Sequence, residues 1–188
     1  MVVNNIQAIL DELKELLSLV SEKEAEAFKG AILNADRIFV AGAGRSLFMI
    51  RGFAMRLMQT GFTSYVVGET VTPAIRKGDL LVIASGSGET GTLKVIASNA
   101  KNAGAEIAMI TSNPDSTIAK LSDYIIVVPS STPKLEENHD KKPSIQPGAS
   151  AFEQSVLLLC DAIVIDLGLD SNIAERNSSL MKLHANLE

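Results

Sequence analysis

The sequence contains one cysteine, two histidines and no tryptophan, and each scarcity narrows the functions open to it. The single Cys160 cannot form an internal disulfide, and with only His139 and His184 beside it a structural zinc site is not expected. The basic residues are scattered and the net charge is −5, so a cationic surface for nucleic acids or anionic membranes is lacking. No apolar run is long enough to span a bilayer, and the first residues do not resemble a secretion signal. We therefore expect a cytoplasmic protein without nucleic-acid or membrane partners.

Hydrophobic patterning divides the 188 residues, enough for one domain, into a helical start and an alternating remainder. In residues 1–34, apolar residues recur at intervals of three and four, and Ser21 followed by Glu24 predicts a capping box at which a second helix begins. In residues 35–188, strand-length runs alternate with helical stretches, which is typical of an α/β fold. We predict a five-stranded parallel sheet, doubly wound as in flavodoxin and flanked by helices, with N-terminal helices and a C-terminal tail. The predicted strands are 37–40, 64–67, 80–84, 106–111 and 124–128, and the predicted helices of this part are 46–59, 90–103, 116–121 and 149–167.

Two loops rich in glycine and hydroxyl residues follow two of the predicted strands. Residues 42–46 read Gly-Ala-Gly-Arg-Ser and residues 85–90 read Ser-Gly-Ser-Gly-Glu-Thr, and each loop leads into a predicted helix. Open parallel sheets bind ligands at the carboxyl ends of their strands, and the N–H groups at a helix start favour an anion. Because Ser85, Ser87 and Thr90 add hydroxyl donors, the second loop predicts a site for a phosphate monoester.

Two nucleotide-binding motifs match these loops only in part. Residues 86–92 approach the spacing of a P-loop but lack its lysine, which disfavours hydrolysis of a nucleoside triphosphate. Residues 42–44 begin a dinucleotide fingerprint, and Glu69 stands where a ribose-binding acid would follow the second strand. However, Leu47 replaces the third glycine, and no second domain remains for a hydride donor or acceptor. A further alternative is that the hydroxyl residues only cap tight turns between strand and helix.

Together the two loops resemble those of the SIS (sugar isomerase) domain family. The resemblance implies that residues 1–188 form a single SIS domain. Within this family the sequence is most similar to the 6-phospho-3-hexuloisomerases. These enzymes interconvert D-arabino-hex-3-ulose 6-phosphate and D-fructose 6-phosphate in the ribulose monophosphate pathway of formaldehyde fixation. The resemblance implies a phosphorylated sugar substrate, no cofactor or metal, and a homo-oligomer, either a tetramer or a dimer. Leu47 departs from the family pattern, which has glycine at this point. The segments that carry the closer similarity are 44–46, 53–58, 67–69, 146–148, 152–154 and 184–188.

The resemblance also implies roles for individual residues. An isomerase of this kind moves a proton between neighbouring carbons, and Glu153 matches the position of the base that forms the enediol. Arg45 is a candidate to neutralise the enediolate or the phosphate, and Ser46 a candidate to assist the phosphate loop. Glu69 is expected to orient sugar hydroxyls, and His184 to open the furanose ring, in related enzymes from a neighbouring subunit.

Simpler roles stay open for the same residues. Glu153 near a helix start would only complement the helix dipole. Arg45 and Glu69 would be charged surface residues, and His184 would be a solvated histidine near the chain terminus. Cys160 is expected to be a small core residue, and His139, in the proline-punctuated loop 130–148, to be solvated. Two other functions also stay open: another phosphosugar isomerase of the arabinose 5-phosphate type, and a non-catalytic module that senses a sugar phosphate.

Overall fold

Five parallel strands form the centre of the computed structural model, which describes residues 1–131, 143–167, 178 and 180–187. The strands lie in the order β2-β1-β3-β4-β5, which confirms the doubly wound, flavodoxin-like sheet that the sequence predicts. β3 is apolar throughout and β4 is buried from its second residue on, because both faces of these central strands are covered. The strands are β1 (Ile38–Gly42), β2 (Ser64–Val66), β3 (Leu80–Ala84), β4 (Glu106–Thr111) and β5 (Tyr124–Val127).

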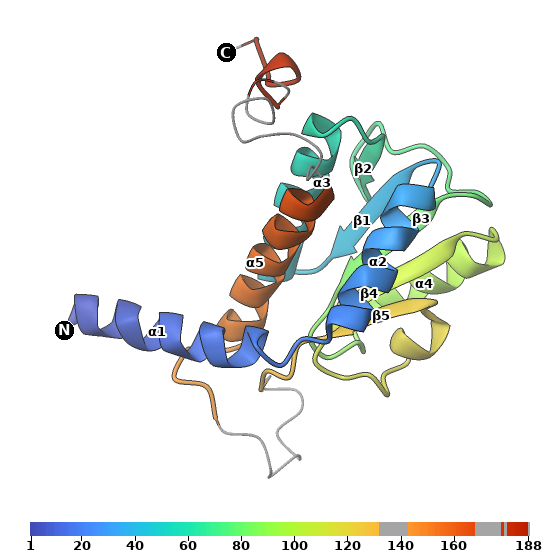
Figure 1. Ribbon diagram of the computed structural model, residues 1–188. Helices are drawn as coiled ribbons and strands as arrows, with labels where there is room; N and C mark the ends of the chain where they lie inside the picture. Colours follow the sequence, from blue (N-terminus) through green and yellow to red (C-terminus); the bar gives the residue numbers. More distant parts are fainter. Residues whose placement is uncertain (132–142, 168–177, 179, 188) are drawn as a thin grey trace.

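Helices cover both faces of the sheet (Figure 1). On one face, α2 (Glu22–Asn34), α3 (Arg45–Gln59) and α5 (Ser150–Leu167) share a hydrophobic core with the strands. On the other face, α4 (Gly91–Asn102) and the 3-10 turn η1 (Ala119–Leu121) close a second core. Alternate side chains of each strand enter the two cores, because successive residues of a strand point to opposite faces. Within the described ranges, no helix is long and apolar enough to cross a membrane.

The predicted elements differ from the observed ones mainly at their ends. The strand predicted at 37–40 continues to Gly42, because β1 stays paired with β3 as far as that residue. The helix predicted at 116–121 is wrong in length, since only the turn η1 forms. There the hydroxyl of Ser116 accepts the N–H of Ala119 at 3.2 Å, a side-chain bond that starts a short turn. Both differences leave the loops at the carboxyl end of the sheet where the sequence predicts them.

The N-terminal helices form as predicted, but the capping box is only half formed. Ser21 Oγ accepts the N–H of Glu24 at 3.4 Å, whereas the Glu24 carboxylate accepts the N–H of Val127 in β5 at 3.0 Å. This bond ties α2 to the edge of the sheet. The first helix, α1 (Val2–Leu17), extends away from the sheet in Figure 1, and its buried residue is Leu13.

Candidate active site

A cavity of about 250 Å³ opens at the carboxyl end of the sheet, beside the loops that follow β1 and β3. The chain leaves these neighbouring strands toward opposite faces, into α3 and α4. Doubly wound sheets bind ligands at such a switch point. The four hydroxyl residues predicted to hold a phosphate, Ser46, Ser85, Ser87 and Thr90, all lie on its wall. The rest of the wall is formed by Ala43, Ala84, Gly86, Leu93, Ala149 and Phe152.

The hydroxyl groups of the second loop are held by its own backbone. Ser85 Oγ accepts the N–H of Gly88 at 3.2 Å, and Ser87 Oγ accepts the N–H of Glu89 at 3.3 Å. In these bonds each hydroxyl is an acceptor, so its own hydrogen can be donated to an anion. Thr90 is the N-cap residue of α4, and its side chain makes no capping hydrogen bond. The loop therefore places three hydroxyl groups on the cavity wall, where each can donate a hydrogen bond to a ligand.

Three helices begin around the cavity, and their dipoles add to the hydroxyl donors. α3 begins after Gly44, whose φ of 57° lies in the left-handed region that glycine adopts without strain. α4 begins after Thr90, and α5 begins next to Ala149. The first turns of α3 and α4 contain no acidic residue. Because helix starts carry partial positive charge, this arrangement favours an anionic ligand such as a phosphate.

Glu153 lies in the first turn of α5, one residue after Phe152 of the cavity wall, and its side chain is 11% exposed. Its Oε2 atom lies 3.0 Å from Nε of Arg45, the first residue of α3. Within the described part of the chain, this buried oxygen has no hydrogen-bond partner of good geometry. A carboxylate that is ion-paired with a guanidinium but accepts no hydrogen bond at this oxygen can take up a proton from a ligand, while the cation faces the negative charge that develops.

Ser150 is a site residue that the sequence analysis missed. Its Oγ accepts a hydrogen bond from Arg45 Nη1 at 2.9 Å and donates to the carbonyl of Pro147 at 2.8 Å. The signal was present, because Ser150 followed by Glu153 has the spacing of a capping box. In the structure the N–H of Glu153 bonds instead to the carbonyl of Ala149, and both side chains of the motif contact Arg45.

Glu69 lies outside the cavity wall. It follows β2 at the same end of the sheet, it is exposed, and its carboxylate pairs with Arg51 on the outer side of α3. The structure therefore brings together the hydroxyl residues, Arg45 and Glu153, but does not bring Glu69 into this group.

His184 also lies apart from the cavity within a single chain. It is exposed, and its Nδ1 lies 3.1 Å from the carbonyl oxygen of Ala185. Figure 1 shows the C-terminal segment beyond the carboxyl end of α5, whereas Glu153 lies at the opposite end of that helix. A role for His184 in catalysis therefore requires the site of another subunit. His139 lies outside the described residues.

Two residues of doubtful role prove to be core residues. Leu47, which departs from the family pattern, packs against the core under α3 and α5 and does not line the cavity. Cys160 is buried in α5, as predicted, and burial raises the pKa of its thiol. A buried thiol with a raised pKa is a poor nucleophile.

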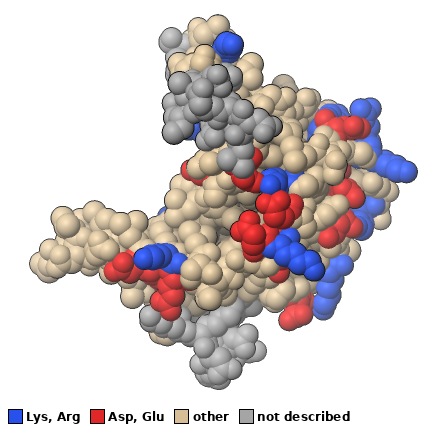
Figure 2. Space-filling view, viewed as in Figure 1, with Lys and Arg blue, Asp and Glu red and all other residues tan. Residues whose placement is uncertain are grey.

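The charges on the surface are mixed in sign. Figure 2 shows acidic and basic residues close together on the face that it presents, without a broad patch of either sign.

Among the described residues, no cluster of three or more histidine, cysteine, aspartate or glutamate side chains could hold a metal ion.

Comparison with known proteins gives the class to which this fold and cavity correspond. A model of the SIS domain matches residues 31–144, and the chain belongs to the SIS domain family. Within it, the chain is 44% identical to the 3-hexulose-6-phosphate isomerase of Bacillus subtilis, over 97% of each chain. It is 38% identical to the enzyme of that name from Mycobacterium gastri, over 100% of this chain and 92% of the relative.

A solved structure supports the same placement. A Methanococcus jannaschii protein, for which a molecular function of 3-hexulose-6-phosphate isomerase is inferred, is 29% identical to this chain with a TM-score of 0.81. The similarity covers 98% of this chain and 99% of the other. The predicted similarity to 6-phospho-3-hexuloisomerases, another name for the same enzymes, is thereby confirmed.

Proposed function

We propose that this protein is an isomerase that interconverts D-arabino-hex-3-ulose 6-phosphate and D-fructose 6-phosphate. The observation that carries the proposal is the juxtaposition of two features at one end of the sheet. One is a cavity lined by four hydroxyl residues beside the starts of three helices. The other is the buried carboxylate of Glu153 paired with Arg45. Near full-length relatives that carry the name of this enzyme give the same substrate class.

The mechanism follows from the chemistry of moving a carbonyl group by one carbon. With the phosphate bound by the loop 85–90, the Glu153 carboxylate removes the proton from C2 of the 3-ketose. The C2–H electron pair forms the C2–C3 double bond of a cis-enediol, and the electrons of the carbonyl move onto O3. The Arg45 guanidinium stabilises this oxyanion. Return of the proton from Glu153 to C3, with transfer of the hydroxyl proton from O2 to O3, gives the 2-ketose. One base on one face of the enediol performs both transfers.

We further propose that the protein works as a homo-oligomer, a dimer or a tetramer. Apolar side chains that a monomer would leave in water occur on two helices. Ile6 and Leu10 of α1 are 51% and 53% exposed, and Phe48 of α3 is 62% exposed. Residues 2–10 contain no charge, and the outer part of α1 is uncharged in Figure 2. A surface of this kind is an aggregation liability unless a second copy of the chain covers it.

The proposed assembly explains how His184 could reach a cavity, and Glu69 is assigned its role from its position at the end of the sheet. We propose that His184 of one subunit completes the cavity of another and transfers the proton that opens the fructose 6-phosphate ring. Glu69, at the same end of the sheet, orients sugar hydroxyls. The reaction consumes the product of an aldol addition of formaldehyde to ribulose 5-phosphate, so we propose that the protein acts in the fixation or removal of formaldehyde. We also propose that it works in the cytoplasm.

A coupled synthesis tests the proposed function. The protein is mixed with ribulose 5-phosphate, formaldehyde and a hexulose-phosphate synthase, and fructose 6-phosphate is measured against a control without the protein. A second reaction offers arabinose 5-phosphate and measures ribulose 5-phosphate. We expect fructose 6-phosphate to appear and the second reaction to be much slower than the first. Faster conversion of arabinose 5-phosphate would identify an aldose isomerase, and phosphate binding without turnover in either reaction would identify a sensor.

A further inference from the structure

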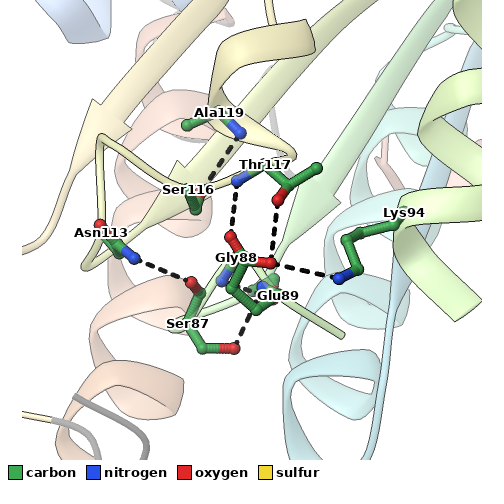
Figure 3. Close-up of polar contacts among 9 residues, drawn as sticks. Ser87, Gly88, Glu89, Lys94, Asn113, Ser116, Thr117 and Ala119 are labelled. Atoms are coloured by element: carbon green, nitrogen blue, oxygen red, sulfur yellow. Dashed lines mark hydrogen bonds and ion pairs between the residues drawn. The ribbon is translucent and has the colours of Figure 1, made fainter. Parts of the chain in front are cut away.

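Glu89 lies inside the phosphate loop but does not contribute to the cavity wall. Its carboxylate turns toward the segment 113–118, which connects β4 to η1 (Figure 3). Oε1 accepts the N–H of Thr117 at 2.7 Å, and Oε2 accepts the Thr117 hydroxyl at 2.9 Å. Lys94 Nζ approaches Oε2 at 3.3 Å from the solvent side. One carboxylate thus holds both donors of a residue 28 positions further along the chain.

The residues next to Glu89 contact the same segment. Asn113 Nδ2 donates to the carbonyl of Ser87 at 3.3 Å, and the N–H of Ile118 donates to the carbonyl of Gly88 at 3.3 Å. Gly88 has a φ of 65°, and a Cβ atom there would lie 2.0 Å from Ser116 Oγ. The segment 113–118 therefore supports the middle of the phosphate loop at close range, and Glu89 supplies the charged bonds of this contact.

The position of Glu89 is unfavourable for binding a phosphate unless it has another purpose. A carboxylate directly before the start of α4 opposes a dianion at that helix start. Hydrogen bonds from the backbone and the hydroxyl of Thr117 lower the pKa of Glu89, with a smaller contribution from Lys94. The group is therefore ionised at neutral pH. The charge of Glu89 repels an anionic ligand. Any favourable effect of Glu89 on phosphate binding therefore comes from its hydrogen bonds with Thr117.

We propose that Glu89 is a positioning residue for the substrate phosphate. By holding Thr117, it fixes the backbone between Ser87 and Thr90 so that both hydroxyls face the cavity before the substrate arrives. This inference rests on the proposed function, because it assigns the phosphate to the loop 85–90. Glu89 itself touches no reacting atom, so its loss weakens phosphate binding and leaves the chemical step unchanged.

Three variants separate the bonds of Glu89 from its charge. Glu89→Gln retains an oxygen for the Thr117 N–H and an amide N–H for the Thr117 hydroxyl, and it removes the charge. Glu89→Ala removes both bonds. Lys94→Ala is the matched control, since it removes the solvent-side partner of the carboxylate without touching segment 113–118. The dissociation constant of inorganic phosphate, the KM and kcat for fructose 6-phosphate, and the melting temperature are measured for each.

We expect Glu89→Ala to raise the phosphate dissociation constant and the KM by about 10- to 100-fold, the range for the loss of hydrogen bonds to a charged group. Its kcat should stay within about threefold of the wild type. Glu89→Gln should bind phosphate as tightly as the wild type or more tightly, and Lys94→Ala should change binding less than about threefold. Thr117→Val, which removes one bond and keeps the fold of the loop, should weaken binding less than Glu89→Ala does.

The wild type is measured first, which separates this inference from the proposed function. A wild type that neither binds phosphate nor isomerises fructose 6-phosphate contradicts both. If the wild type does both, unchanged phosphate affinity in Glu89→Ala overturns the role of Glu89 alone. The same holds for a loss that glutamine fails to restore, and for a fall in kcat at constant KM. If Glu89→Ala does not fold, the comparison of Thr117→Val with the wild type decides, and equal phosphate affinity overturns the proposal.

Discussion

Glu153→Gln separates the chemical step from binding, because glutamine keeps the size of the side chain and loses the base. Loss of a general base lowers the rate by about 10²- to 10⁴-fold. At about 1.4 kcal/mol per tenfold change, this corresponds to a barrier higher by about 3–5 kcal/mol. The kcat for fructose 6-phosphate should fall by this factor, since the proton at C3 then has no acceptor on that face of the sugar.

The same substitution should have little effect on the fold. The ion pair that it removes joins Glu153 Oε2 to an Arg45 side chain that is 55% exposed. Water can therefore solvate the guanidinium, and Ser150 continues to accept a hydrogen bond from its Nη1. The loss of such an ion pair costs about 0–1 kcal/mol of stability. We expect a melting temperature within a few degrees of the wild type and a dissociation constant for inorganic phosphate within about threefold.

The assay compares kcat, phosphate affinity and melting temperature in the wild type, Glu153→Gln and a matched control. Asp161→Asn removes one negative charge from an exposed position of the same helix, so it reproduces the change in net charge at a distance from the cavity. A kcat of Glu153→Gln within threefold of the wild type would refute the assignment of the base. An equal loss in Asp161→Asn would show that net charge, and not proton transfer, explains the effect.

The remaining predictions concern binding, assembly and pH. Ser87→Ala should raise the KM for fructose 6-phosphate by about 10- to 100-fold in steady-state kinetics, and an unchanged KM would place the phosphate elsewhere. Reassembled mixtures of Glu153→Gln and His184→Ala subunits should recover part of the activity that each lacks, whereas inactive mixed oligomers would contradict sites shared between subunits. Burial disfavours the ionised form of Asp79, but its bonds from Arg37 and from backbone outweigh burial and lower its pKa from the ordinary value of 3.8. Its contribution to stability is therefore complete above pH of about 4 and is lost as the pH falls further. Urea unfolding should show the stability difference between wild type and Asp79→Asn shrinking below that pH, and a constant difference would contradict the assignment.

The fold could be predicted because its signals are local. Runs of β-branched residues separated by amphipathic helices specify a doubly wound sheet wherever they occur. Of the five strands, 80–84 and 106–111 are predicted with their observed bounds. Strand pairing extends β1 by two residues beyond the predicted end, because pairing depends on the neighbouring strand and not on the residues of β1 alone.

The candidate site could be predicted where its residues are close in sequence. Ser85, Ser87 and Thr90 belong to one loop, so their spacing already places three hydroxyls at a helix start. The contact of Arg45 with Ser150 joins residues 105 positions apart, and a capping-box pattern does not show that such a pair forms. His184 is a harder case, because its predicted partner is in another copy of the chain.

The central claim is that the protein moves a proton between C2 and C3 of a phosphorylated ketose, and exchange in D₂O measures this directly. Fructose 6-phosphate is incubated with the protein in D₂O, without formaldehyde or a coupling enzyme, and followed by proton NMR. We predict that the C3 proton signal disappears in the presence of the wild type while both C1 protons remain, and that Glu153→Gln slows the exchange by about 10²- to 10⁴-fold. Exchange at C1 would show an aldose–ketose isomerase, and full retention of the C3 proton by the wild type, with no 3-ketose formed, would contradict the account.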